Sequence, residues 1–270
     1  MLFDIRDQQK ARDTLLRITG VPFDVWERET NHRNERFKYD DDFVDYVIQR
    51  HGCYNVRYED LEFVFSHLTS SDNNCDSIKR HGIVDLREAY ETTDSEIRQF
   101  LDKHRVYIDT DLAILSYKSR EYSISYGRHS LLDSEEEQLC KKIGYRLYRD
   151  FCVCGFLSID ESRPYLTRID QKPEFLMDIG NLIGKAIDQE WACTHHSYEV
   201  IAKVPSSNVV CESEQPTDKG KLLCYLCFAF NNAIENISQN VLLCKDGISI
   251  PPQDIVEVMP FTGWDEEDSE

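Results

Sequence analysis

Apolar residues recur at the spacing of an α-helix in two segments near the N-terminus. Residues 4–18 gather their apolar side chains on one face, and Gly20 follows as a stop signal. Residues 41–50 repeat the pattern, and the segment between the two helices is polar. The pattern therefore predicts two helices, and residues 1–57 are expected to form a helical N-terminal cap.

The next segment combines a strand, a loop, a helix and a stop signal. An apolar run over 63–68 predicts a buried strand, and the polar cluster Ser-Ser-Asp-Asn-Asn follows it. Asn73 or Asn74 is a suitable helix cap, and Gly82 suits the left-handed residue that ends a helix. His67 is thus expected at a strand end beside a helix start, where the polar groups of ligands are commonly held.

The middle of the chain alternates between helical and strand patterns. The expected elements are short helices within 86–104, strands at 112–117 and 122–126, a helix over 134–150, a buried strand over 151–159 and a long helix over 172–192. The long helix begins at Pro173, which suits a first helical turn, and its apolar residues recur with a period of about 3.6 residues.

Strand patterns dominate towards the C-terminus. Strands are expected at 198–204, 241–244 and 255–259, whereas 222–230 fits either a strand or a helix, and 263–270 is an acidic tail. Helices come first and strands later, without the regular alternation of βαβ units. The predicted fold is therefore α+β: a helical N-terminal extension, followed over 58–262 by a mixed, mainly antiparallel sheet core with flanking helices.

The charge of the chain limits the partners it can attract. Its 50 acidic and 31 basic residues give a formal net charge of −19, which repels phosphate backbones at long range. Direct nucleic-acid binding is disfavoured, although a nucleic acid remains a possible acceptor in a transfer reaction. A local site for a nucleotide needs only one or two arginines, and the acidic surface also suits a protein partner.

The cysteines and the apolar runs indicate a cytoplasmic protein. Ten cysteines are spread through a chain whose first residues are charged and do not resemble a signal peptide. Reduced thiols are the better interpretation, and the longest apolar run, 222–230, is too short to span a bilayer. Cys224 and Cys227 lie inside that run and not in a polar turn, so we expect buried free thiols and no metal.

One arrangement of motifs resembles a known family. A strand carrying His67-x-Thr69, a capped helix ending Ile-x-x-x-Gly, and C-terminal strands closing on Pro-Pro-x-x-Ile-x-x-Val are similar to the ADP-ribosyltransferases. The likeness spans 63–261 and is greatest to the members with a histidine on the first core strand, the diphtheria-toxin-like and DNA-modifying-toxin groups. The resemblance implies that NAD is the substrate, that His67 holds a ribose of NAD, and that Thr69 supports it.

The resemblance also implies two further binding residues. Family members stack a tyrosine on the nicotinamide ring, and Tyr117, Tyr122 and Tyr126 all fit this role; Tyr122 is the candidate we adopt. Arg128 follows a glycine at a predicted strand end, and a guanidinium binds phosphate oxygens in bidentate fashion. Arg120, Arg146 and Arg149 could also contact the pyrophosphate of NAD, and Arg128 is the candidate we adopt.

The chain departs from the family at the catalytic glutamate. Asn240 occupies the expected position, and an amide offers no negative charge to the cation that develops as nicotinamide leaves. The nearest carboxylate is Glu235. Two functions follow. One is an NAD-consuming ADP-ribosyltransferase or NAD glycohydrolase, of the kind found in bacterial and phage conflict systems. The other is a catalytically inactive nucleotide-binding or acidic inhibitor protein on the same scaffold.

Overall fold

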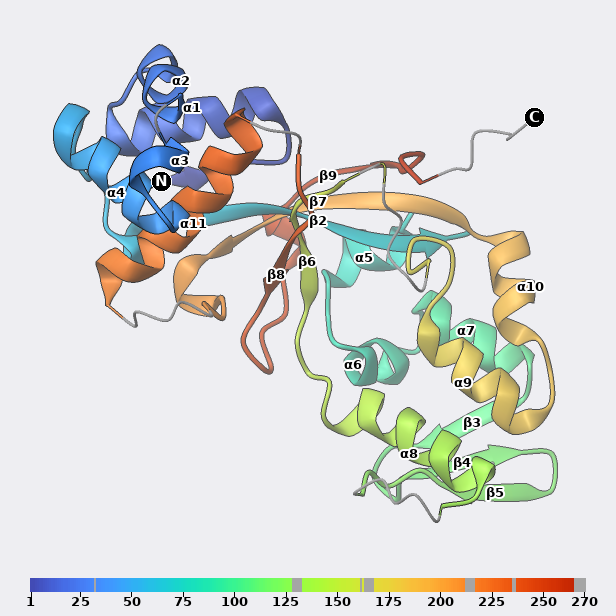
Figure 1. The fold of residues 1–270 in the computed structure, drawn as a ribbon. Helices are drawn as coiled ribbons and strands as arrows, with labels where there is room; N and C mark the ends of the chain where they lie inside the picture. Colours follow the sequence, from blue (N-terminus) through green and yellow to red (C-terminus); the bar gives the residue numbers. More distant parts are fainter. Residues whose placement is uncertain are drawn as a thin grey trace, which may run out of the picture. The chain divides into compact units, whose positions relative to one another are not determined.

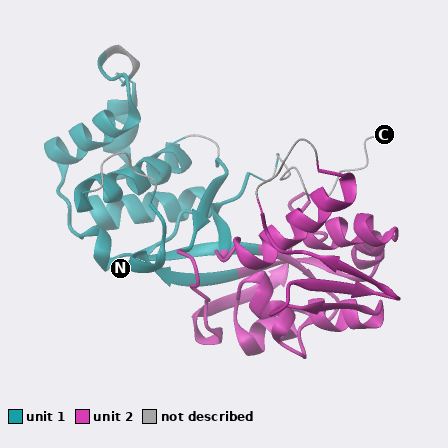
Figure 2. Cartoon of the chain, turned by 90° about the horizontal axis from the view of Figure 1, so that it is seen from below, with its two compact units in different colours: residues 1–67, 154–162, 201–244 teal, residues 68–153, 163–200, 245–270 magenta. Residues whose placement is uncertain are grey.

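The computed structural model places most of the chain in two compact units. It describes residues 1–31, 33–127, 133–160, 162, 168–211, 217–234 and 237–264 (Figure 1). Unit 1 comprises Met1–His67, Cys154–Ser162 and Ile201–Cys244, and unit 2 comprises Leu68–Val153, Arg163–Val200 and Lys245–Glu270 (Figure 2). The units do not divide at residue 57, where the sequence analysis placed a boundary, and most of the expected acidic tail lies outside the described residues.

Unit 1 contains a group of helices drawn from both ends of its sequence. These are α1 (Gln8–Thr19), α2 (Phe23–Thr30), α3 (Arg33–Arg36), α4 (Asp40–His51) and α11 (Asp218–Ile234). The two expected N-terminal helices are confirmed as α1 and α4. The segment between them was expected only to be polar, but it forms α2 and α3, because Trp26 supplies a fully buried anchor for an otherwise polar helix.

Helix α11 settles an alternative that the sequence left open. Its central run is apolar on nearly all sides, and in unit 1 it packs against α1 and α4. The ring of Phe230 lies 5.5 Å from Trp26 and 5.3 Å from Phe43, between centroids, and all three side chains are buried. Residues 222–230 are therefore helical because they are surrounded by other helices.

The large sheet has the strand order β8-β6-β2-β7-β9, and β1 pairs in parallel with β2. The strands are β1 (Leu2–Phe3), β2 (Glu62–Ser71), β6 (Cys154–Ser158), β7 (His196–Pro205), β8 (Asn240–Leu243) and β9 (Ile255–Pro260). The pairs β2–β6 and β6–β8 are antiparallel, with Ser66 opposite Phe156. The predicted α+β fold, with helices first and a mainly antiparallel sheet, is confirmed.

Strand β2 is longer than the apolar run that predicted it. It continues through Ser70 and Ser71, so His67 lies within the strand and not at its end. The prediction ended the strand at its first polar pair, but both serines are buried and their hydroxyls have partners: Ser70 accepts the indole N–H of Trp191 and Ser71 donates to Glu96. Hydrogen-bonded hydroxyls can thus continue a buried strand.

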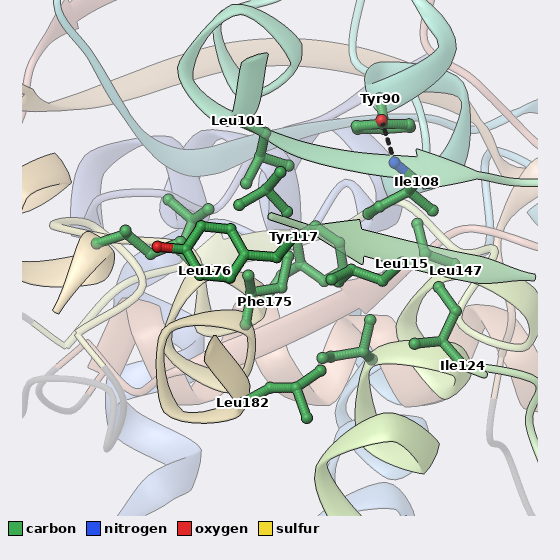
Figure 3. Packing of buried hydrophobic residues seen from close by; sticks show 14 of the residues in the cluster. Tyr90, Leu101, Ile108, Leu115, Tyr117, Ile124, Leu147, Phe175, Leu176 and Leu182 are labelled. Atoms are coloured by element: carbon green, nitrogen blue, oxygen red, sulfur yellow. Dashed lines mark hydrogen bonds between the residues drawn. The ribbon is translucent and has the colours of Figure 1, made fainter. Parts of the chain in front are cut away.

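Unit 2 contains a three-stranded antiparallel sheet covered by helices. The strands are β3 (Val106–Asp109), β4 (Ile114–Tyr117) and β5 (Arg120–Ser123), and the helices are α5 (Asp76–His81), α6 (Leu86–Glu91), α7 (Glu96–Lys103), α8 (Glu135–Tyr148), α9 (Glu174–Ile183) and α10 (Ile187–Thr194). Buried side chains of the sheet and of α7 to α10 form one apolar core (Figure 3). Strand β3 was not predicted, because its four residues alternate too briefly to give a signal.

The prediction of one long helix over 172–192 is wrong, because the segment forms two helices, α9 and α10. Gly184 ends α9 in the left-handed conformation, with φ of 67°. The apolar period continues across the break because both helices contribute buried residues, among them Leu182 and Ile187, to the same core. A pattern of burial cannot distinguish one straight helix from two helices that share a core. In the parts of the chain that the structure describes, no helix is long and apolar enough to cross a membrane.

Candidate functional site

His67 lies on β2 with its imidazole ring held in one tautomer. The ring is half-buried, and its Nδ1 atom lies 2.9 Å from the carbonyl oxygen of Cys154 on the neighbouring strand β6. A carbonyl oxygen only accepts hydrogen bonds, so Nδ1 carries the proton. Burial lowers the pKa of His67, although the bond to Cys154 opposes that effect. The ring is therefore neutral near pH 7, and its Nε2 atom presents a lone pair.

Thr69 lies two residues further along β2, and its side chain ends in a hydroxyl group. It is half-buried between the buried residues Leu68 and Ser70. Within the described residues, no protein group hydrogen-bonds the Thr69 hydroxyl. This side chain can accept a hydrogen bond from a ligand or donate one to it.

Ser71, the last residue of β2, organises the loop that follows. Its hydroxyl is buried, donates to Oε1 of Glu96 at 2.6 Å, and accepts the backbone N–H groups of Asn73 and Cys75 at 3.2 and 2.7 Å. Asn74 and Cys75 both have positive φ, 63° and 58°, which is unfavourable for residues with a side chain. The bonds from Ser71 hold this strained turn in place. Cys75 directly precedes helix α5, and Asn73, one of the two expected caps, accepts the N–H of Asp76, the first residue of the helix, at 3.1 Å.

Glu96 and Asp72 form a carboxyl pair beside this turn. Burial raises the pKa of Glu96 to about 7. The negative charge of Asp72 and its hydrogen bond to Glu96 raise it further, whereas the bonds from Ser71 and from the backbone of Asn73 oppose the rise. A carboxyl group whose pKa lies near neutral pH can give or take a proton in a reaction. Glu96 therefore has the chemistry of a general acid or base.

A stack of aromatic rings supports the end of β2 within unit 2. The indole of Trp191 on α10 donates to the hydroxyl of Ser70 at 2.7 Å, and the ring of His195 lies parallel to it, 3.6 Å away between centroids. Nδ1 of His195 lies 3.0 Å from the carbonyl oxygen of Trp191. Burial lowers the pKa of His195, which keeps its ring uncharged in the stack. The stack thus joins the end of β2 to helix α10.

Sequence analysis did not identify Ser71, Asp72 or Glu96 as functional residues. The polar cluster after β2 was interpreted as a loop, and short helices were expected within 86–104. Glu96 lies in the first turn of one of these helices, α7, where the side chain of Ser95 accepts the N–H of Arg98. A glutamate in the first turn of a helix is common, so the sequence gives no sign of the pair. Only the structure shows that Glu96 accepts a hydrogen bond from Ser71, which lies 25 residues earlier in the sequence.

Asn240 lies at the start of β8 in unit 1, with its amide engaged inside the protein. Its Nδ2 atom lies 2.8 Å from the hydroxyl oxygen of Ser158 and 3.2 Å from the carbonyl oxygen of Ser238. The side chain is 9% exposed, and Asn232 joins the same network. This amide stabilises the junction of β8 and β6. Glu235, the other candidate for the catalytic role, lies outside the described residues.

The three candidate tyrosines belong to unit 2 and differ in exposure. Tyr122 is 4% exposed and packs in the apolar core, with the guanidinium of Arg120 4.8 Å from its ring centroid. Tyr117 is also buried, whereas Tyr126 is 37% exposed and contacts the ring of Tyr145 edge to face. The role of Tyr122 in stacking on nicotinamide stays a prediction, and its position is that of a core residue. Arg128 lies outside the described residues.

The cysteines of the chain are free thiols. All ten are described, and none is paired in a disulfide. Burial raises the pKa of Cys75 to about 12, and the carboxylate of Glu96 adds to the rise, so this thiol is protonated at neutral pH. Over the described residues, His, Cys, Asp and Glu side chains form no group of three or more that could hold a metal ion.

A comparison of the chain with protein families, curated proteins and solved structures finds no match.

Proposed function

We propose that the protein binds NAD and consumes it, as an ADP-ribosyltransferase or an NAD glycohydrolase. The observation that supports this most is His67, whose neutral ring is oriented by the carbonyl of Cys154. A fixed Nε2 lone pair is a suitable acceptor for a ribose hydroxyl, and the hydroxyl of Thr69 lies two residues along the same strand. These residues carry the resemblance to the ADP-ribosyltransferases.

The reaction breaks the N-glycosidic bond between nicotinamide and ribose. Nicotinamide leaves with the bonding electron pair, and positive charge develops on the ribose as in an oxocarbenium ion. A carboxylate close to the ribose stabilises that charge, and Glu235 is the residue we assign to this role. Water then gives ADP-ribose, or an acceptor nucleophile takes the ADP-ribosyl group. Asn240 does not serve as the acid in this proposal, because its amide is engaged by Ser158 and Ser238.

The test is release of nicotinamide from NAD by the purified full chain. We expect release by the wild type and a loss of about 5- to 30-fold for His67→Ala, because the lost hydrogen bond contributes about 1–2 kcal/mol. His51→Ala is the matched control, since His51 bonds Glu29 in the helical part of unit 1. Free ADP-ribose as the second product indicates hydrolysis, and labelled protein or nucleic acid indicates transfer. No release above background by the wild type contradicts the enzymatic function.

A second function is favoured by one observation, the internal use of the Asn240 amide. A scaffold whose catalytic position is filled by a structural residue could bind NAD or a related nucleotide without turnover. The net charge of −19 would then suit a basic protein partner, for which an acidic inhibitor competes with nucleic acid. Thermal shift with NAD and with ADP-ribose separates the two functions: stabilisation without nicotinamide release supports binding alone. The ten free cysteines favour the cytoplasm as the place of either function.

A further inference from the structure

Two lysines and a tyrosine converge at one corner of unit 2. Tyr117 ends β4, Lys118 follows it in the turn to β5, and Lys185 lies in the connection between α9 and α10. The ammonium groups of Lys118 and Lys185 lie 5.1 and 5.6 Å from the centroid of the Tyr117 ring. We call these three residues the Tyr117 cluster.

The packing of the core fixes the tyrosine of this cluster. The ring of Tyr117 is 7% exposed and lies among the buried side chains of the apolar core (Figure 3). The ammonium groups of Lys118 and Lys185 are the charges that act on its hydroxyl. Burial alone would raise the pKa of Tyr117, but Lys185 and Lys118 outweigh it and lower the pKa. The two positive charges are therefore concentrated at the phenol oxygen.

The two lysines of the cluster lie in turns with a defined backbone conformation. Lys118 has a φ of 54°, a left-handed conformation that the tight turn between β4 and β5 requires. Lys185 follows Gly184, the left-handed residue that ends α9, and its N–H donates to the carbonyl of Gly180 at 2.9 Å. Both side chains are exposed and extend from well-defined turns.

No carboxylate of the described residues neutralises the two ammonium groups of the cluster. Among the described residues, no carboxylate oxygen lies within 4.0 Å of the ammonium group of Lys118 or Lys185. Several other lysines of unit 2 pair with acids: Lys103 with Glu190, Lys141 with Asp133, and Lys172 with Asp188. In a chain of net charge −19, two ammonium groups close to one tyrosine make a local positive site that can attract an anion.

We propose that the Tyr117 cluster binds the phosphate dianion of a small phosphomonoester. Two ammonium groups match the charge of the dianion, and together with the phenol O–H they supply three donors for its three terminal oxygens. The site lies wholly within unit 2 and does not depend on the function proposed for His67. A carboxylate, with one negative charge, would leave one ammonium group uncompensated.

The test uses inorganic phosphate as the probe of the full chain. Isothermal titration with phosphate, against sodium chloride at equal ionic strength, should give a dissociation constant of roughly millimolar. Lys118→Met and Lys185→Met should each weaken phosphate binding about tenfold, because each removes one charge-assisted hydrogen bond. Lys38→Met is the matched control: its ammonium group lies 4.9 Å from the ring centroid of Tyr39, with one lysine instead of two.

A second readout identifies the tyrosine. In an ultraviolet titration of tyrosinate, the transition at the lowest pH should be absent in Tyr117→Phe and should move to higher pH when phosphate is bound, since a dianion disfavours the phenolate. The proposal is overturned if phosphate gives no more heat than chloride, if Lys38→Met weakens binding as much as Lys185→Met, or if phosphate leaves the tyrosinate transition unchanged.

Discussion

Replacing Glu96 by glutamine should stabilise the protein at neutral and alkaline pH. Burial beside Asp72 raises the pKa of Glu96 from 4.5 to about 7, so the native state holds a proton that the unfolded state has already lost between these pH values. Native-state stability is therefore complete below pH 4.5 and decreases as the pH rises to about 7. Glutamine resembles the protonated carboxyl group, and its amide oxygen can still accept from Ser71.

The size of the effect follows from the pKa change. A rise from 4.5 to about 7 corresponds to at most ~3 kcal/mol of unfolding free energy, at about 1.4 kcal/mol for each pH unit. Glu96 is only half-buried, and solvent screening reduces this to about 1–2 kcal/mol. Glu96→Gln should thus raise the melting temperature by about 2–6 °C at pH 8 and leave it unchanged near pH 4.

The assay is thermal unfolding followed by circular dichroism at a series of pH values from about 4 to 8. Glu91→Gln is the control of opposite sign, because hydrogen bonds from Arg87 and Thr110 lower the pKa of Glu91. That variant should lose stability at pH 8 and converge with the wild type as the pH falls. Equal melting temperatures of the wild type and Glu96→Gln across the whole pH range would refute the carboxyl pair.

Two further substitutions test the packing around the proposed site. Asn240→Asp should cost about 1–3 kcal/mol of unfolding free energy, because a carboxylate would replace the amide donor that faces the carbonyl oxygen of Ser238 at 3.2 Å. Urea unfolding measures this loss, and Asn208→Asp, at a half-exposed position, is the control. Gly82→Ala should cost about 2 kcal/mol or more, since φ is 89° and the added Cβ would overlap the backbone oxygen of Ile250. A Gly82→Ala variant that melts like the wild type would contradict the close approach of these two segments.

Periodicity predicted the elements that pack on one face. Helices α1 and α4 and the strand cores of β6 and β7 were identified because their apolar residues recur at a fixed spacing. The same rule failed where burial did not follow hydrophobicity. Ser71 is buried and polar, so β2 was cut short, and the shared core of α9 and α10 hid the break at Gly184.

The site residues show the same limit. The sequence placed His67 and Thr69 correctly on a strand, because the strand pattern is local. The tautomer of His67 depends on Cys154, which lies 87 residues away, and no local pattern contains that contact. Glu96 likewise acquires its raised pKa from burial and from Asp72, both of which depend on how α7 packs against the loop after β2. Chemistry that arises from distant contacts was therefore missed.

Calorimetric titration of the full chain with NAD tests the central claim, that His67 holds NAD on β2, most directly. We expect saturable binding by the wild type, the same affinity for the His51→Ala control, and at least about tenfold weaker binding by His67→Ala, because the variant lacks the oriented Nε2 acceptor. Binding of NAD by His67→Ala with wild-type affinity, or no binding by the wild type, would contradict the claim.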